Sequence, residues 1–227
     1  MRRDTYIIIP VYNEEKVIVS VVKKVLKNFS NVVCINDGST DSSAAEILKT
    51  EAHLVNHPVN MGQGAAIQTG IEYALQDKNI KYFVTFDADG QHSLADVEAM
   101  LKYIKEHQVD IVLGSRFLGS AQNLTGFRKF ILKLAVKFSN FTTGLKLTDA
   151  HNGLRVFNRK VAENLHITMP DMAHASEIIH RIAEHNFRYK EVPVTITYTD
   201  YSKAKGQSAI NAVNITFDIL LQKVIKK

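Results

Sequence analysis

The sequence predicts an α/β protein whose sheet is mostly parallel and covered by helices on both faces. Short runs of apolar and β-branched residues alternate about five times with segments of helical periodicity between residues 6 and 114. Polar clusters close the strand-like runs, and ligands of such sheets bind beyond the carboxyl ends of the strands. The alternation therefore predicts the fold class, and the clusters predict where a ligand site lies.

The first half of the chain supplies most of the expected sheet. Its helices are expected where apolar residues recur at helical spacing, and Pro10 is expected to end the pairing of the first strand. The expected strands are Tyr6–Val11, Val32–Ile35, His53–Asn56, Tyr82–Phe86 and Asp110–Gly114. The expected helices are Glu14–Asn28, Ala44–Glu51, Gln63–Leu75 and Leu94–Glu106.

After Arg116 the periodicity changes and basic residues become frequent. Pro193 in the last strand-like run suggests an edge strand or a bulge. The expected elements are a basic amphipathic helix over Gly126–Gly144, a strand over Leu154–Phe157, a helix over Ala175–His185, a strand over Tyr189–Tyr198 and a terminal helix over Ile210–Lys227. Because no linker or internal repeat interrupts the chain, we expect residues 1–227 to form one domain.

The composition of the 227 residues excludes several classes of protein. With 45% hydrophobic and 22% charged residues, the chain is globular and not disordered. The single Cys34 excludes a disulfide framework and a Cys-based zinc site, and its apolar strand predicts an unreactive thiol. No apolar run reaches the roughly 18 residues that span a bilayer, and the N-terminal apolar stretch is too short for a signal peptide. We therefore expect a soluble or peripheral protein in the cytoplasm.

The charge is unevenly distributed along the chain. Residues 1–113 carry a net charge of −4 and residues 114–227 carry +9, which together give the overall +5. The acidic half suggests carboxylates that hold a metal, and the basic half suggests groups that face phosphates or a membrane surface. Basic helices with solvated faces are the alternative explanation. The basic half contains no nucleic-acid-binding motif, so a nucleic-acid partner is not expected.

The sharpest functional signal is the segment Asp87–His92, DADGQH, directly after a strand-like run. Hard carboxylate oxygens bind Mg²⁺ or Mn²⁺, usually with substrate phosphates completing the coordination shell. A turn at Asp89 or Gly90 would let Asp87 and Asp89 serve neighbouring parts of one ligand. A helix N-cap with solvated acids explains an isolated Asp-x-Asp motif equally well, so the neighbouring loops must decide between the two.

Three further polar clusters are expected at the same edge of the sheet. Tyr12 offers a stacking face for a base, and a buried Asp37 would accept a hydrogen bond from a base N–H. Gly62 and Gly64 let backbone amides approach a phosphate or ribose at a helix N-terminus. A simple glycine turn is the alternative for this last cluster, but four such loops on one edge favour a nucleotide site.

Taken together, these clusters resemble the family 2 inverting glycosyltransferases of the GT-A fold. Within that family the chain is most similar to the dolichol-phosphate mannosyltransferase and polyprenyl-phosphate glycosyltransferase branch. The resemblance rests on residues 10–14, 37–41, 60–65, 87–92, 114–117 and 149–157. It implies a single GT-A domain in which residues 1–115 bind a nucleotide-sugar and residues 116–227 bind the acceptor.

The resemblance also implies roles for individual residues. The expected donor-binding positions are Pro10, Tyr12, Glu14 and Asp37 around the base, Gly62 and Gly64 beside them, and Asp87 and Arg155 near ribose or phosphate. Asp89 and Gln91 would ligate the Mg²⁺ or Mn²⁺ that bridges the diphosphate, which makes Asp89 catalytic as well. His92 and His151 lie in the matching segments as candidate ligand contacts.

The acceptor is predicted from two arginines and from what the chemistry requires. In the polyprenyl-phosphate branch two Arg grip the acceptor phosphate, and the matching residues are Arg116 and Arg128. A phosphate is already anionic at neutral pH, so it needs positioning by Arg and no general base. A sugar hydroxyl would need a carboxylate base, for which Asp149 and Glu177 are the candidates. Residues 206–208 are Gly-Gln-Ser where the branch usually has Gly-Lys-Ser.

The leading expectation is transfer of a hexose from a GDP- or UDP-sugar to a polyprenyl phosphate. The alternatives are transfer to a sugar hydroxyl in polysaccharide synthesis and a non-catalytic nucleotide-binding subunit.

A polyprenyl acceptor would place the enzyme at a membrane surface, because the lipid chain must stay in the bilayer. Phe and Lys are interleaved in Gly126–Gly144, as they are in interfacial helices, although packing of the apolar face on the core is the alternative. Many relatives in the branch carry C-terminal transmembrane helices that this chain does not show. We therefore expect a peripheral enzyme at the inner face of a membrane, or one that needs a membrane partner protein.

Overall fold

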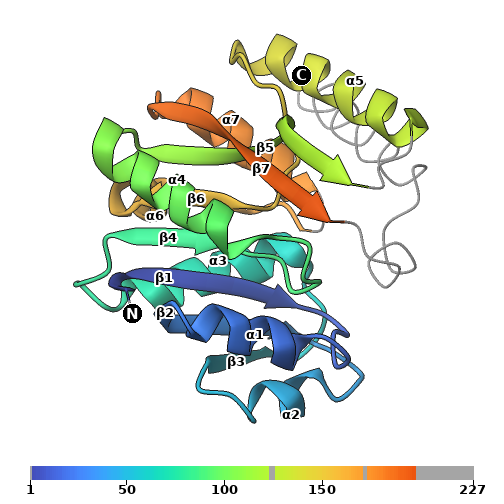
Figure 1. Ribbon diagram of the computed structural model, residues 1–227, viewed down its shortest axis with the longest axis vertical. Helices are drawn as coiled ribbons and strands as arrows, with labels where there is room; N and C mark the ends of the chain where they lie inside the picture. The colour runs from blue at the N-terminus through green and yellow to red at the C-terminus, as the bar shows by residue number, and fades with distance from the viewer. Residues whose placement is uncertain (1, 123–125, 171–172, 198–227) are drawn as a thin grey trace.

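The computed structural model describes residues 2–122, 126–170 and 173–197 (Figure 1). Within these residues seven strands form one sheet in the order β3-β2-β1-β4-β6-β5-β7. The strands are β1 (Arg2–Val11), β2 (Phe29–Asp37), β3 (His53–His57), β4 (Tyr82–Thr85), β5 (Ile111–Gln122), β6 (Arg155–Asn158) and β7 (Tyr189–Thr197). Only β6 runs antiparallel to its neighbours in this sheet, so the predicted α/β class with a mostly parallel sheet is confirmed. The expected terminal helix Ile210–Lys227 and the segment 206–208 lie outside the described residues.

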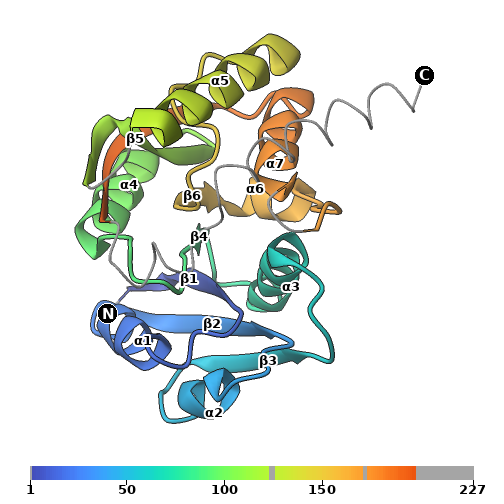
Figure 2. The same ribbon diagram turned by 90° about the vertical axis from the view of Figure 1, so that its right-hand side faces the viewer.

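Helices cover both faces of the sheet, as Figure 2 shows. One face carries α1 (Ile18–Leu26), α2 (Ser43–Ile47) and α4 (Leu94–His107). The other carries α3 (Gln63–Leu75), α6 (Arg159–Asn164) and α7 (Ala173–Glu184), and α5 (Gly126–Thr143) packs beside α7. None of the helices in these described ranges combines the length and hydrophobicity needed to cross a bilayer.

The alternation of side chains along β1 explains the two-sided core. Tyr6 and Ile8 join the hydrophobic cluster beneath α3, α6 and α7, whereas Ile7 and Ile9 join the cluster beneath α1 and α4. Successive side chains of a strand point to opposite faces, so a central strand with both faces covered must be apolar throughout. Full burial of each such side chain contributes about 1.5–3 kcal/mol.

Pro10 does not end strand pairing, so that expectation is wrong. It lies within β1, and the ladder continues with Pro10 opposite Ile35 and Val11 opposite Asn36. Pro10 lies two residues after Ile8, so the backbone groups of both residues point to the same side of the strand. On that side the carbonyl of Ile8 accepts the amide of Phe86 at the end of β4. The missing N–H of Pro10 therefore faces the side where the β4 ladder has already ended, and no bond is lost.

Two further differences from the expected elements have simple causes. β5 extends well beyond the expected Asp110–Gly114, because it pairs with β7 again between Ser120 and Gln122 after an irregular stretch. α6 was not expected, since its six residues are too few for a periodic signal. Its N-cap is Asn158, whose side chain accepts the amide of Val161. The edge position predicted from Pro193 is confirmed, because β7 is an outer strand of the described sheet.

Cys34 lies in the middle of β2 and is fully buried. Burial raises the pKa of its thiol to about 12, which disfavours the reactive thiolate and agrees with the predicted inertness.

Candidate active site

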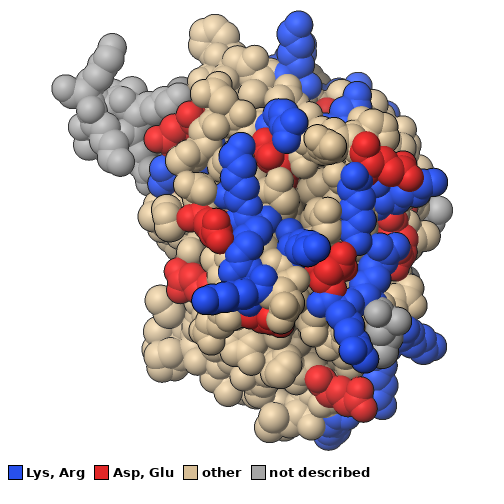
Figure 3. Space-filling view, turned by 90° about the vertical axis from the view of Figure 1, so that its left-hand side faces the viewer, with Lys and Arg blue, Asp and Glu red and all other residues tan. Residues whose placement is uncertain are grey.

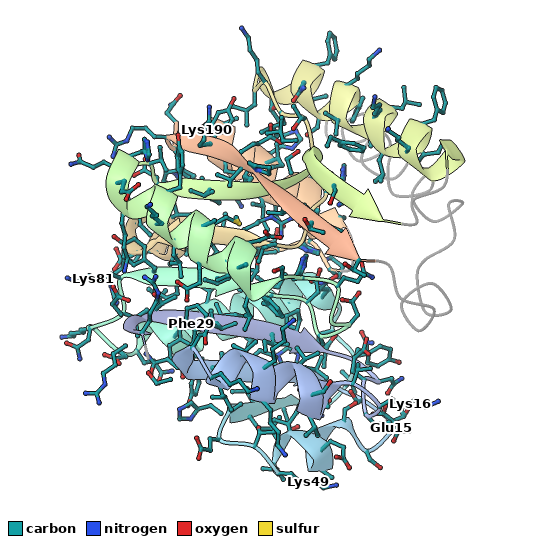
Figure 4. All side chains as sticks on the ribbon, in the orientation of Figure 1. Glu15, Lys16, Phe29, Lys49, Lys81 and Lys190 are labelled. Carbon is teal, nitrogen blue, oxygen red and sulfur yellow. The ribbon has the colours of Figure 1, made fainter. Side chains whose placement is uncertain are left out.

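The predicted polar clusters meet at one edge of the sheet. Glu15 and Lys16 mark this edge at the end of β1 in Figure 4, and Lys81 and Lys190 lie at the opposite edge. Figure 3 looks at that opposite side, where Lys and Arg side chains are interspersed with Asp and Glu. Ion pairs such as Lys105–Asp4, at 2.8 Å, connect charges there. The basic residues on that side therefore behave as a solvated mixed surface, and the acidic site is elsewhere.

Asp87 is held by protein side chains directly after β4. His92 Nε2 lies 2.8 Å from its Oδ2, and Gln63 Nε2 donates to its Oδ1 at 3.2 Å. Burial raises the pKa of Asp87, but the nearby His92, Arg155 and His174 outweigh that effect and hold the pKa below its ordinary value. Asp87 is thus a fixed, negatively charged group at the site edge.

Asp89 is the less stable anion of the pair. Burial and the negative charge of Asp87, with a further contribution from Glu14, raise the pKa of Asp89 to about 6. Its carboxylate accepts the backbone N of Gln91 at 3.0 Å and the side-chain Nε2 of Gln91 at 2.6 Å. Gln91 is therefore a hydrogen-bond donor to Asp89 in this structure, and its role as a second metal ligand stays a prediction.

The donor set around Asp89 suits a hard divalent cation. Carboxylate oxygens are what Mg²⁺ and Mn²⁺ prefer, and the repulsion among Asp89, Asp87 and Glu14 is what a cation would relieve. No group of three or more His, Cys, Asp or Glu converges to hold a metal within the part of the chain that the structure describes.

Arg155 lies inside the protein and not at an open ligand surface. It is 2% exposed on β6, and its Nη1 has no hydrogen-bond partner among the described residues. Burial lowers the pKa of Arg155 to about 10, opposed by the charges of Asp87 and Asp149. In this structure Arg155 acts as a buried counter-charge to Asp87, and its contact with a phosphate stays a prediction.

Gly153 brings the 149–155 segment against Asp87. A Cβ at Gly153 would lie 2.3 Å from Asp87 Oδ2 and 2.7 Å from Oδ1, distances that force something to shift. Its carbonyl also accepts the hydroxyl of Thr85 at 2.6 Å. Only glycine allows this approach, so Gly153 positions Asp87 although sequence reasoning gave it no role of its own.

Asp37 organises the loop that follows β3. Its Oδ1 accepts Met61 N at 2.9 Å and contacts His57 Nδ1 at 2.7 Å, and its Oδ2 accepts Gly62 N at 2.8 Å. Gly38, with φ of +64°, lets the backbone of Val59 and Asn60 approach closely. The structural role of Asp37 is therefore clear, and its contact with a base stays a prediction.

The two glycines of the third cluster, Gly62 and Gly64, make close contacts within the protein. The Gly62 amide donates to Asp37 and to Asn60 Oδ1, so it is already used inside the protein. A Cβ at Gly64 would lie 2.1 Å from the Met169 carbonyl, so this glycine serves the packing of α3. Both glycines thus have structural roles, and the approach of their amides to a phosphate or ribose stays a prediction.

Tyr12 and Glu14 lie in the loop between β1 and α1. Tyr12 is 43% exposed and so presents its ring to solvent at the site edge. Glu14 is buried, and its amide donates to Ser43 Oγ at 2.7 Å. Asn13 accepts the amide of Thr40 at 2.8 Å, which joins this loop to the one after β2. Base-pocket roles for Tyr12, Glu14 and Pro10 stay predictions.

Arg116 is locked to Asp149. The carboxylate Oδ2 of Asp149 accepts Arg116 Nε at 2.6 Å and Arg116 N at 3.0 Å. Asp149 is 2% exposed and its own amide donates to Glu191 Oε1 at 2.8 Å, so a buried network orients the arginine. Arg128 lies in the first turns of α5, and its side chain is outside the described part of the structure.

Both carboxylates considered as a general base are occupied by protein donors. Asp149 holds Arg116, as above. Glu177 is 7% exposed and accepts the amides of Thr168 and Met169 at 2.9 and 2.8 Å, together with the Thr168 hydroxyl. Asp149 accepts on both oxygens, since its Oδ1 also accepts the amide of His151 at 3.3 Å, so each of the two carboxylates is already engaged by protein donors.

Several site residues were missed by sequence reasoning. His57 and Gln63 contact Asp37 and Asp87 through pairings that only the sheet and α3 create, so no local motif signals them. His92 was not missed, since the sequence marks it as a candidate ligand contact, but its contact with Asp87 across the turn at Gly90 (φ of +76°) was not foreseen.

Comparison with known proteins identifies the family. The model of glycosyl transferase family 2 matches residues 6–165. The UDP-N-acetylglucosamine–dolichyl-phosphate N-acetylglucosaminyltransferase of Methanococcus voltae is 29% identical, covering 97% of this chain and 96% of that protein. The polyprenol monophosphomannose synthase of Mycolicibacterium smegmatis is 27% identical, covering 88% of this chain and 80% of that protein.

A solved structure supports the fold independently. Glucosyl-3-phosphoglycerate synthase from Mycobacterium tuberculosis, crystallised with Mn²⁺, UDP and phosphoglyceric acid, superposes with a TM-score of 0.70 at 14% identity. The match covers 95% of this chain and 78% of that one. With the family match over residues 6–165, this chain belongs to glycosyl transferase family 2 and is a glycosyltransferase of the GT-A fold.

Proposed function

We propose that this enzyme uses a divalent cation to transfer a hexose from a nucleoside-diphosphate sugar to a polyprenyl phosphate at a membrane surface. The observation that carries the acceptor assignment is that Asp149 and Glu177 are both tied to protein donors. A hydroxyl acceptor needs a carboxylate to take its proton, whereas a phosphate acceptor needs only a cationic grip. The site therefore favours a phosphate acceptor over a sugar hydroxyl.

Arg116 is the residue proposed to grip the acceptor phosphate. Its planar guanidinium suits a phosphate, and the buried Asp149 fixes its orientation before a ligand arrives. Arg128 is proposed as the second arginine from the sequence resemblance. The two relatives named above support this reading, since one is named for dolichyl phosphate and the other for the synthesis of polyprenol monophosphomannose.

Asp89 is proposed to hold Mg²⁺ or Mn²⁺ against the donor diphosphate. When bound, the cation would neutralise the charge that develops on the departing nucleoside diphosphate. Asp87 stays ionised beside it because His92 and Arg155 hold its pKa down. Attack from the face opposite the leaving group would invert the anomeric carbon.

The exposed face of α5 is proposed to contact the membrane. Phe130, Leu134 and Phe141 are 64%, 54% and 89% exposed, although they are large and apolar. Lys133 and Lys137 are exposed on the same helix. An apolar row bordered by lysines is what an interfacial helix presents to anionic lipid. Val136 and Ser139 are buried and attach the other face of the helix to the domain.

The proposal is tested by measuring release of nucleoside diphosphate from a panel of nucleotide-sugars with Mn²⁺. Polyprenyl phosphate in vesicles and soluble glycans are supplied as separate acceptors, each with and without a chelator. We expect release that depends on both polyprenyl phosphate and metal, and Asp89→Asn should abolish it while Glu72→Gln, an exposed change on α3, should not. Stimulation by soluble glycans alone would reject the polyprenyl acceptor, and full activity in the chelator would reject the metal.

A further inference from the structure

The hydrogen bonds of Asp37 leave its two oxygens unequal. Oδ1 forms hydrogen bonds with both Met61 N, at 2.9 Å, and His57 Nδ1, at 2.7 Å. Within the described residues, Oδ2 accepts one hydrogen bond, from Gly62 N at 2.8 Å. Because its partner is a carboxylate oxygen, His57 Nδ1 is the donor. A carboxylate offers about four acceptor positions, two on each oxygen. The bonds within the described residues therefore fill Oδ1 and leave one position on Oδ2.

His57 cannot easily release this oxygen. It is paired directly opposite Asp37 in the β2–β3 ladder, and its side chain is 8% exposed. Its other nitrogen, Nε2, lies 2.9 Å from the hydroxyl of Thr69 on α3. Both ring nitrogens are thus engaged, and turning the ring away from Asp37 would leave a buried polar group unpaired. No motif in the sequence draws attention to this residue.

The single remaining position discriminates among nucleotide bases. Guanine presents two adjacent N–H groups that pair with both oxygens of one carboxylate at once. Uracil and thymine present one ring N–H at N3, which needs one acceptor position. Cytosine at N3 and adenine at N1 carry a lone pair that a carboxylate repels. A carboxylate with Oδ1 already filled therefore suits uracil or thymine and leaves one N–H of guanine unpaired.

We infer that the donor is a uridine or thymidine diphosphate-sugar and not a guanosine one, and that His57 determines this choice by filling Oδ1 of Asp37. The inference rests on the proposed function, with Asp37 as the base contact. His57 acts through Asp37 and is a specificity-determining, positioning residue.

Two substitutions of His57 separate this role from a purely structural one. His57→Asn places an amide N–H at the position of Nδ1, so Oδ1 stays filled. His57→Gln places its amide at the position of Nε2, so the contact with Thr69 is kept and Oδ1 is released. Thr69→Val removes only the distal hydrogen bond at nearly constant shape. Each variant is first compared with the wild type by its melting temperature, which should differ little between His57→Asn and His57→Gln.

The experiment measures the dissociation constants of UDP, dTDP, GDP, CDP and ADP by calorimetry with Mn²⁺ on the full chain. We expect the wild type and His57→Asn to bind UDP or dTDP at least tenfold more tightly than GDP. In His57→Gln this preference should fall to about threefold or less, and Thr69→Val should shift it in the same direction by a smaller factor.

Four outcomes would overturn the inference. Wild-type binding of GDP as tight as that of UDP would refute it while leaving a working glycosyltransferase site. An unchanged UDP-to-GDP ratio in a folded His57→Gln protein would refute the role of His57. Tightest binding of CDP or ADP would refute the base assignment, and failure to bind any of the five would overturn the proposed function as well.

Discussion

The backbone amide and the guanidinium Nε of Arg116 both donate to one oxygen of Asp149, at 3.0 and 2.6 Å. The carboxylate is 1% exposed and the arginine side chain 9% exposed, so water screens this pair weakly. Ion pairs of this kind add little net stability against an apolar alternative, but removing one partner leaves the other charged and buried. The pair is therefore best understood as fixing the direction of Arg116.

Asp149→Ala should destabilise the fold strongly, because it leaves Arg116 without its carboxylate. We expect the free energy of unfolding to fall by about 3–5 kcal/mol, measured by urea denaturation. The matched control is Glu184→Ala, which removes the exposed partner of Arg181 on α7 and should cost less than about 1 kcal/mol. Equal effects of the two substitutions would show that Asp149 does not carry a buried charge interaction.

Gly153→Ala should damage the site more than the fold. The added Cβ would lie 2.3 Å from Asp87 Oδ2, so the carboxylate must move away from His92 and Gln63. We expect at least a tenfold loss of affinity for the preferred nucleoside diphosphate with Mn²⁺, equivalent to about 1.4 kcal/mol. Gly126→Ala, where a Cβ meets nothing within 4 Å, is the control and should bind as the wild type does. Unaltered binding by Gly153→Ala would remove Gly153 from the site.

The buried His151 should make the free energy of unfolding depend on pH. Burial lowers its pKa from 6.5 to about 4, with the charges of Arg116 and Arg155 adding to that effect and Asp149 opposing it. Below pH 6.5 the unfolded chain binds a proton at this residue that the folded chain does not bind until about pH 4. Stability should therefore fall as the pH falls through this window, by on the order of 3 kcal/mol.

His151→Gln isolates this contribution, because glutamine stays neutral and still reaches Ser176, which His151 Nε2 contacts at 3.3 Å. Unfolding by urea at several pH values between 7 and 4 should show a shallower loss of stability in the variant. His166→Gln, an exposed histidine, should follow the wild type. Parallel curves for His151→Gln and the wild type would mean that His151 takes up its proton in the folded state at its ordinary pKa.

The sequence predicted those parts of the molecule that local periodicity and strand-end clusters encode. Gln63–Leu75 was expected as a helix with the bounds that α3 has, because glycine and glutamine mark its start and apolar residues recur at helical spacing. The α/β class followed from the alternation of strands and helices. The antiparallel direction of β6 could not be predicted, since the residues of Arg155–Asn158 look the same in either direction.

Site residues were predictable where a motif carries them and not where the fold brings them together. Asp87 and Asp89 stand out as a motif, whereas the contact of His57 with Asp37 depends on the register of β3 against β2. The burial of Arg155 and the hydrogen bond from the Gly62 amide to Asp37 were likewise not visible in the sequence, and the ligand contacts expected of both residues stay predictions. Burial of a charged group and use of an amide inside the protein are tertiary properties that a linear pattern does not record.

The exposed row on α5 predicts binding to anionic membranes. Phe130 and Phe141 are 64% and 89% exposed and lie eleven residues apart, close to three helical turns, so both fall on one face. Replacing both with Gln should weaken binding to vesicles that contain anionic lipid at least fivefold, measured by co-sedimentation. Raising the salt concentration should weaken binding further, because the lysines of α5 act through screened charge.

The control for this prediction is Leu48→Gln, which removes an equally exposed apolar side chain, 70% exposed, at the C-terminus of α2. If vesicle binding depended only on general surface hydrophobicity, the Leu48 variant would lose it as the α5 double variant does. If the α5 surface is specific, the Leu48 variant binds vesicles like the wild type and the double variant does not.

A second measurement uses a soluble acceptor. In solution, turnover of a water-soluble, short-chain polyprenyl phosphate should stay unchanged in the double variant, since the substitutions remove membrane contact and leave Arg116 and Asp149 in place. A parallel loss of soluble turnover would mean that α5 supports the catalytic site directly and not through the membrane.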